Sequence, residues 1–287
     1  MIGQNLLDNL VCQKCLSRLK LNPDKNRLFC SVCQKEYFIK NNKLYILEYK
    51  ENDFNRSNAD VVINRLKIFF KNYPKIFNIF YYLFGASFVG RSPQEAISVI
   101  GKDKIILNLG SGIRKIRDDV ISVDYYPFNN VDIVADITHL PFADASIDAI
   151  INEEVLEHVV NPREVINEIK RVLKPNGLFY LTVPFVAAFH SSPSDYYRWS
   201  KEGLKELVRD FEELESGIRH GPTSAMLSVV NDWLATILSF GSNNLHQVFL
   251  MVFMVVTFPL KIFDYLISKF PSAQNIAFGF YYIGKKK

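Results

Sequence analysis

The sequence predicts an α/β fold built on a doubly wound, mostly parallel β-sheet. Between residues 104 and 185, short apolar runs alternate with a segment of helical periodicity. Short buried strands separated by helices are typical of a parallel sheet with helices on both faces. The first apolar run ends in a glycine-rich turn, as expected where a strand of such a sheet leads into a ligand site.

Strands are expected at residues 105–109, 120–123, 131–134, 147–151 and 178–183, with two more at 211–218 and 276–283. A helix is expected at 161–173, where Pro162 lies in the first turn and apolar residues recur at helical spacing. Residues 174–177 read as a stop before the next strand. A second helix, 201–209, begins after Ser200, a good N-cap residue.

Composition divides the 287 residues into three parts. Residues 1–47 form a small cysteine-containing unit, residues 48–100 a linker with a basic, aromatic helical segment, and residues 101–287 the α/β domain. An apolar helical insert occupies residues 222–275 within that last domain. Hydrophobic residues at 48% and charged residues at 22% are typical of a folded protein.

Four cysteines in the first unit have the spacing of a metal site, in the pairs Cys12/Cys15 and Cys30/Cys33. Each pair places two thiolates on one tight turn, and four thiolates complete the tetrahedral shell of a structural Zn²⁺. The unit resembles a zinc ribbon, although two disulfides or four reduced thiols are alternatives. The N-terminus lacks the basic and apolar regions of a secretory signal, so we expect a cytoplasmic protein with reduced thiols.

The glycine turn is followed by two acidic residues at the ends of the next two strands. Gly110 and Gly112 let the backbone pass close to a ligand. Asp124 is suited to accept hydrogen bonds from both hydroxyls of a ribose, and Asp136 from an adenine amino group. All three elements would lie at the carboxyl ends of the strands, where α/β sheets bind ligands. Each aspartate alone could equally be a helix cap or a turn residue.

The stretch from residue 104 to 212 resembles the class I S-adenosylmethionine-dependent methyltransferases, in particular the group with the ubiquinone and menaquinone C-methyltransferases. Its most specific pieces are DITHLPFADASIDAI, VLEHV and EIKRVLKPNGLFYLTVP. The resemblance implies a Rossmann-like methyltransferase sheet and S-adenosyl-L-methionine as cofactor. The cofactor contacts expected on this basis are Asn108, Gly110, Ser111, Gly112, Asp124, Tyr125, Asp136, Ile137 and Asn152.

The chain departs from that family at the glycine motif. Asn108 stands where an acidic residue is usual, and Arg114 replaces the third glycine. Only 11 residues separate Gly112 from Asp124, so the first crossover must be very short or irregular. A subgroup with the same short link and a later H…P-x-D-Y-x-R-[WY]-[ST] stretch resembles methyltransferases encoded beside surface-polysaccharide genes.

Candidate catalytic residues follow the fourth and fifth strands. Glu154 and His158 are four residues apart, which would place them on one helical face. The alternative is that Glu154 and Glu157 lie on a solvated face and that His158 is a buried structural histidine.

The loop after the fifth strand holds His190 and Asp195 as further catalytic candidates. Tyr196, Arg198 and Trp199 would bind a substrate, the arginine through a phosphate or carboxylate and the aromatic rings through a sugar. Alternatively, Asp195 and Arg198 only pair to order the loop.

Residues 233–260 contain no Asp, Glu, Lys or Arg, but their densest apolar part, Val248–Leu260, is 13 residues long. Because a membrane span needs about 20 apolar residues, an interfacial or hairpin arrangement is expected. The acceptor is then a sugar, a lipid-linked glycan or another lipid-like molecule, with peripheral contact at the inner membrane face. The basic aromatic residues at 61–84 would either meet headgroups or pack on the core.

Two other functions are compatible with the sequence. An RNA methyltransferase is one, although the apolar insert and a net charge of only +4 make nucleic acid an unfavoured partner. A catalytically silent binding module of the same fold is the other, on the strength of Asn108 and Arg114.

Overall fold

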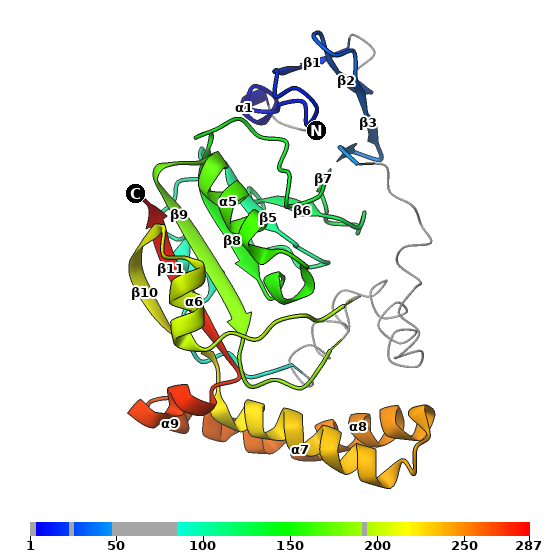
Figure 1. Ribbon diagram of the computed structural model, residues 1–287, viewed down its shortest axis with the longest axis vertical. Helices are drawn as coiled ribbons and strands as arrows, with labels where there is room; N and C mark the ends of the chain where they lie inside the picture. The colour runs from blue at the N-terminus through cyan, green and yellow to red at the C-terminus, as the bar shows by residue number, and fades with distance from the viewer. Residues whose placement is uncertain (1–3, 23–25, 48–84, 191–193) are drawn as a thin grey trace.

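The computed structural model describes residues 4–22, 26–47, 85–190 and 194–287. Its centre is one eleven-stranded sheet with the order β1-β2-β3-β4-β7-β6-β5-β8-β9-β11-β10 (Figure 1). The expected basic aromatic segment at 61–84 lies outside the described residues.

Five parallel strands form the middle of this sheet and correspond to the first five expected strands. The strand order reverses between β5 and β8, which is where α/β sheets open a crevice for ligands. Their bounds are β5 Ile106–Leu109, β6 Ile121–Asp124, β7 Ile133–Val134, β8 Ile147–Glu153 and β9 Leu173–Pro184.

Two antiparallel pairings complete this side of the sheet. β11 (Gly279–Lys286) runs antiparallel to β9, and β10 (Phe211–His220) pairs with β11 at the edge. β9 begins five residues earlier than expected. The expected stop at 174–177 is a bulge inside the strand, with Asn176 at a φ of +60° and a register shift opposite Ile147/Ala149. The sheet is therefore a Rossmann-like, mixed α/β sheet.

The two faces of the sheet are covered differently. α5 (Pro162–Val172) and α6 (Lys201–Leu207) lie on one face, and Ser200 caps α6 as expected. On the other face, among the described residues, the helical cover is the four-residue α4 (Pro93–Ala96), followed by the buried Ile97. The expectation of full helices on both faces is thus wrong for this part of the chain, and the first crossover at 110–120 contains turns only.

The cysteine-containing unit is joined to the main sheet. β4 pairs in parallel with β7, through Leu44↔Ile133 and Tyr45↔Val134. The Nζ atom of Lys43 donates to three carbonyl oxygens of the loop before β7, at 2.7–2.9 Å. The unit comprises α1 Gln4–Leu7, β1 Leu19–Leu21, β2 Arg27–Cys30, β3 Glu36–Lys40 and β4 Lys43–Tyr45.

The apolar insert forms a layer of helices at the end of the sheet toward which β9 points (Figure 1). One helical stretch, Asn243–Ile267, is 25 residues long and contains an 18-residue window with a mean hydropathy of 1.9, so it is long and apolar enough to cross a membrane by length and composition. This helical stretch is longer than the 13-residue apolar part on which the sequence-based expectation of an interfacial helix depends. Its elements are α7 Pro222–Leu238, α8 Asn243–Thr257, η3 Phe258–Phe263, α9 Asp264–Ile267 and η4 Pro271–Ile276.

Candidate active site

The four cysteine sulfurs meet between the turns that carry them. All four Sγ atoms lie within 4.8 Å of one another, with Cys12–Cys33 at 3.5 Å and Cys15–Cys30 at 3.4 Å. Zinc–sulfur bonds of about 2.3 Å at tetrahedral angles place sulfurs about 3.8 Å apart. The thiols are not joined by disulfides. The arrangement fits a structural Zn²⁺.

The glycine turn after β5 is shaped by two left-handed residues. Gly110 and Gly112 have φ values of +69° and +54°. A Cβ on Gly110 would lie 2.4 Å from Val155, whereas one on Gly112 would meet nothing within 4 Å. Asp124 accepts hydrogen bonds from the backbone N–H of Gly112 at 2.7 Å and of Tyr126 at 2.9 Å. The carboxylate at the end of β6 therefore holds the turn, with open space above Gly112.

Two buried oxygens beside this turn have no hydrogen-bond partner among the described residues. They are Ser111 Oγ and Asn152 Oδ1, although the Asn152 amide nitrogen donates to Leu109 O at 3.1 Å. Leaving a buried polar atom unsatisfied costs about 1–3 kcal/mol. A polar ligand in the crevice would satisfy these atoms, so the cradle fits a cofactor at this place.

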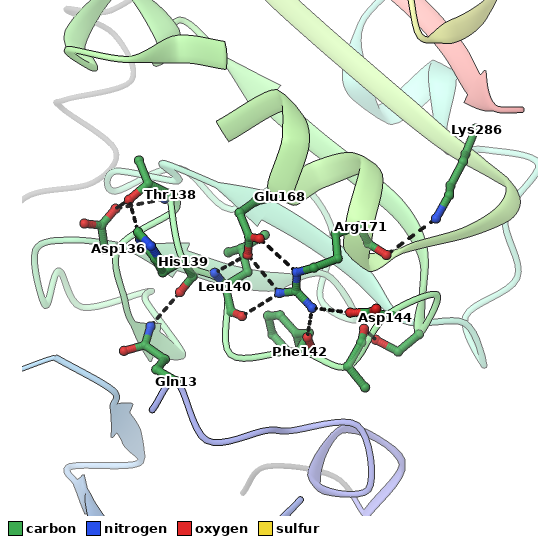
Figure 2. A network of polar contacts seen from close by, with 12 residues as sticks. Gln13, Asp136, Thr138, His139, Leu140, Phe142, Asp144, Glu168, Arg171 and Lys286 are labelled. Carbon is green, nitrogen blue, oxygen red and sulfur yellow. Dashed lines mark hydrogen bonds and ion pairs between the residues drawn. The ribbon is translucent and has the colours of Figure 1, made fainter. Parts of the chain in front are cut away.

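Asp136 caps the turn that follows β7. Its Oδ1 accepts from the Thr138 backbone N–H at 2.8 Å and from the Thr138 hydroxyl at 2.7 Å (Figure 2). Ile137 is buried beside it and Tyr125, after β6, is 40% exposed. Asp136 is therefore a turn residue, which is one of the two interpretations of the sequence. The turn uses its Oδ1 atom and does not need Oδ2.

The cysteine-containing unit contacts this same loop. Gln13 Nε2 donates to His139 O at 2.5 Å, and the Val11 N–H donates to Pro141 O at 2.9 Å. From the other side, Glu168 of α5 accepts from the Leu140 N–H, and Arg171 donates to Leu140 O (Figure 2). The loop after β7 is thus held between α5 and the cysteine-containing unit.

Two glutamates end β8 on the ligand side. Glu153 lies 3.4 Å from Arg114 and 3.8 Å from Arg219, so the arginine in place of the third glycine pairs with a carboxylate of the crevice. Glu154 has a φ of +53°, a conformation that costs a non-glycine residue energy and is concentrated at functional sites. The Glu154 N–H donates to Thr182 Oγ1 at 3.1 Å, which fixes this turn to β9.

Burial raises the pKa of Glu154 to about 7, with the negative charge of Glu153 acting in the same direction. Its Oε1 atom lies 3.7 Å from His220 Nε2. Burial beside Arg219 and Arg114 lowers the pKa of His220 to about 3, so the imidazole is neutral and does not hold Glu154 in its charged form. A carboxyl group that titrates near neutral pH is suited to proton transfer.

Glu154 and His158 do not share a helical face, and that expectation is wrong. β8 continues to Glu153, Glu154 is left-handed, and Leu156–His158 form a single 3-10 turn, η2. The Glu157 side chain is fully buried, so the expectation of a solvated face is also wrong for this residue. Both of its oxygens are without a hydrogen-bond partner in the described part of the chain, and burial raises its pKa well above the usual range.

The loop after β9 is organised by one ion pair. Arg198 Nη2 donates to Asp195 Oδ2 at 2.6 Å, and its other donors reach the carbonyl oxygens of Ala187 and Ala188. The Asp195 carboxylate also accepts from the His190 N–H at 2.9 Å. Asp195 and Arg198 therefore order the loop, the simpler of the two interpretations of the sequence.

The aromatic residues of this loop differ in exposure. Trp199 is 9% exposed and packs against Tyr197 in the core, so it is not placed to stack on a sugar. Tyr196 is 50% exposed, and its N–H donates to Glu157 O at 2.7 Å. His190 is half-exposed, with its ring 5.0 Å from that of His158.

Three charged or titratable residues of the crevice do not follow from the sequence pattern, namely Glu157, Arg219 and His220. Arg219 and His220 end β10, whose carboxyl end comes to the crevice only through the strand order β9-β11-β10. The signal available for Arg219 and His220 was their position directly after an expected strand, the same signal that identified Asp124.

Comparison with known proteins places a methyltransferase domain in this sheet. Residues 115–181, from the first crossover to β9, match the family described as "methyltransferase domain". A probable S-adenosylmethionine-dependent methyltransferase of Mycolicibacterium smegmatis is 32% identical over 153 residues, 44% of this chain and 59% of that protein. A demethylmenaquinone methyltransferase of Clavibacter sepedonicus is 34% identical over 107 residues, 35% of this chain and 42% of that protein.

Among solved structures, phosphoethanolamine N-methyltransferase 2 of Haemonchus contortus, with phosphomonomethylethanolamine and S-adenosylhomocysteine, is 16% identical with a TM-score of 0.43. The match covers 77% of this chain and 59% of that one. The chain spans about half the length of the two curated relatives, 59% and 42%. The match to a methyltransferase domain thus lies in the part of the sheet from the first crossover to β9.

Proposed function

We propose that this chain is an S-adenosylmethionine-dependent methyltransferase. The observation that supports the proposal most is the cradle at the reversal of strand order. There the glycine turn, the Asp124 carboxylate and the two unsatisfied oxygens of Ser111 and Asn152 come together at the carboxyl ends of β5, β6 and β8. Residues 115–181 supply part of this cradle and match a methyltransferase domain.

The cofactor would lie over the glycine turn. In this proposal Asp124 accepts from the ribose hydroxyls, since the two oxygens of a carboxylate offer about four acceptor positions in all. Asp136 takes the adenine end, flanked by Ile137, and Tyr125 covers the ribose from its exposed position. The methionine end would meet Ser111, Asn152 and the backbone near Gly110, with Asn108 below.

The cofactor supplies a methyl group on a sulfonium, and the chain has to align an acceptor with it and take a proton if the acceptor is a hydroxyl. We assign the proton transfer to Glu154, whose pKa of about 7 is set by burial. His190 and His158 contact each other in the segments that follow β9 and β8, and Asp195 fixes the loop that holds His190. Arg198 acts through Asp195, which leaves Tyr196 for contact with the acceptor.

The acceptor class is suggested by the apolar helices. Twenty of the 31 exposed large hydrophobic side chains of the described residues lie between Met226 and Ile276. An exposed apolar area of this extent on a protein marks a site that meets another apolar body. The acceptor is therefore proposed to be a lipid-like molecule or a lipid-linked glycan, reached from the inner face of a membrane.

Buried polar contacts favour a docked hairpin over a span. Asp264 is fully buried and accepts hydrogen bonds from the Thr223 N–H at 2.6 Å and the Ser224 hydroxyl at 2.6 Å. Lys261 donates to Gly85 O at 2.6 Å. These contacts tie the end of the 25-residue stretch to the domain, so the helices would lie in the interface with their apolar side chains toward the lipid.

Calorimetry with S-adenosylmethionine and S-adenosylhomocysteine tests the cofactor. Micromolar binding of both is expected, and a chain that binds neither would be a silent module or have another ligand. Vesicle flotation tests the lipid surface. The variant Val252→Ser/Val255→Ser/Phe258→Ser should lose flotation, whereas a matched control at Val32 and Val99 should keep it. If the native chain ignores vesicles but binds RNA with strong salt dependence, the acceptor is an RNA instead.

A further inference from the structure

A second metal site is indicated at Glu157, His158 and His190. The carboxylate oxygens and ring nitrogens of these residues offer one ligand atom each, all within 4.8 Å of one another. His158 Nε2 lies 3.8 Å from Glu157 Oε1. Glu157 and His158 belong to η2 after β8, and His190 belongs to the loop after β9. A hydrogen bond from the Tyr196 N–H to Glu157 O joins these two segments.

The glutamate provides a separate argument for a ligand. Its side chain is fully buried, and within the described residues neither carboxylate oxygen has a hydrogen-bond partner. A carboxylate buried in this way is stable only if it is protonated, paired or bound to a metal. Glu154 and Asp195 add negative charge nearby, which a bound cation would compensate.

Both histidines are oriented as metal ligands are. The Nδ1 atom of His158 is hydrogen-bonded to Ser194 O, and that of His190 lies 3.4 Å from Asp195 Oδ2. Histidine ligands commonly donate one ring N–H to a carbonyl or carboxylate, which places the lone pair on the other nitrogen. Here that nitrogen is Nε2 in both rings, and the Asp195–His190 pair repeats a carboxylate–histidine–metal arrangement.

We propose that Glu157, His158 and His190 bind a divalent first-row transition metal ion of the Zn²⁺ type, separate from the cysteine site. Two imidazoles and one carboxylate are the ligand set of zinc sites that keep an open position, whereas Mg²⁺ and Ca²⁺ prefer oxygen alone. The open position would face the crevice beside Glu154.

The role of this second metal site in catalysis rests on the proposed methyltransferase function. A hydroxyl of the acceptor bound at the open position would be acidified. Its proton passes to Glu154, its oxygen forms the bond to the methyl carbon, and the carbon–sulfur bond breaks with its electron pair left on sulfur. The products are a methyl ether and S-adenosylhomocysteine. The metal thus selects acceptors that bear a hydroxyl, as sugars do.

Metal counting on the full chain tests the site. After reduction and reconstitution with Zn²⁺, two equivalents are expected, one of which is lost in Glu157→Gln and in His190→Ala and retained in the control Glu202→Gln. Excess Mg²⁺ should not displace it. Because His190 is half-exposed, its replacement does not endanger folding. Asp195 contacts the ligand His190, so Asp195→Asn should weaken the affinity for the second metal ion by about 10–100-fold.

The outcomes separate the two proposals. One equivalent in the native chain, or two in both Glu157→Gln and His190→Ala, would overturn the second site and leave Glu157 as a protonated buried carboxyl. Cobalt substitution gives an independent readout, since thiolate charge-transfer bands report the cysteine site and weaker ligand-field bands report the other. A chain that holds two metals but binds no S-adenosylmethionine would contradict the proposed function alone.

Discussion

Replacing Glu154 by glutamine removes a carboxyl group that the fold makes hard to ionise. Burial raises its pKa to about 7 from its ordinary value of 4.5, and 24% of the side chain is exposed. Because the folded pKa is above the unfolded one, Glu154 favours folding fully below about pH 4.5 and loses this contribution as the pH rises through about 7. Glutamine does not titrate, so the variant should not show this loss.

The size of the effect follows from the shift. A shift from 4.5 to about 7 corresponds to about 3 kcal/mol in total, of which about 2 kcal/mol falls between pH 5.5 and 8.5. Across that range, the free energy of unfolding of the native chain should fall relative to Glu154→Gln by about 2 kcal/mol. Groups that titrate alike in both chains cancel in the difference.

Urea unfolding at pH 5.5, 7.0 and 8.5 measures this difference, with the exposed Glu202→Gln as control. If the native and Glu154→Gln stabilities run parallel over this range, burial of Glu154 does not have the consequence described. The same variant tests catalysis. Methyl transfer by the native chain should rise with pH through about 7, and the variant should be slower by about 10²–10⁴-fold, as for other lost general bases.

Three other changes test separate parts of the structure. Asp124→Ala should weaken S-adenosylmethionine binding more than tenfold in calorimetry, since hydrogen bonds to a charged acceptor contribute about 1.5–3 kcal/mol each. The exposed Asp118→Ala is its control, and equal affinities would refute the ribose assignment. Cys12→Ser should lose the zinc of the cysteine site and also weaken cofactor binding, because Gln13 and Val11 hold the loop after Asp136. Cofactor affinity unchanged after zinc loss would show that this docking is passive. Asp264→Ala should lower the free energy of unfolding by about 3 kcal/mol or more, as it leaves the buried donors of α7 unpaired, and an unchanged urea midpoint would contradict that role.

The parts of the fold that depend on local pattern could be predicted from the sequence. Periodicity located the strands of the parallel sheet and the buried face of α5, and the spacing of Cys12, Cys15, Cys30 and Cys33 located the sulfur cluster. The pairing of β4 with β7 could not be read in this way, because a strand of three residues is too short to show a periodicity of its own. Long-range pairing depends on backbone hydrogen bonds that any residue provides.

A residue of the candidate site could be predicted only where its position at the end of a strand was enough to indicate its role. Asp124 follows a strand and faces the glycine turn, so its position alone is informative. Glu157 was assigned to a solvated face because a helix was assumed after β8, whereas the left-handed Glu154 turns the chain inward and buries it. A helical-face argument fails whenever a positive φ interrupts the helix.

The position of the apolar insert connects the proposed lipid surface to the crevice. The insert leaves the sheet after His220 and returns at Gly279, and Gly279 pairs with Pro184 at the carboxyl end of β9. Both roots of the helical layer are therefore at the ligand edge, and His220 lies 3.7 Å from Glu154. A molecule held at the base of these helices would be next to the residues assigned to proton transfer. An apolar surface placed elsewhere on the sheet would serve attachment only, whereas at this edge it would also deliver the proposed lipid-linked acceptor.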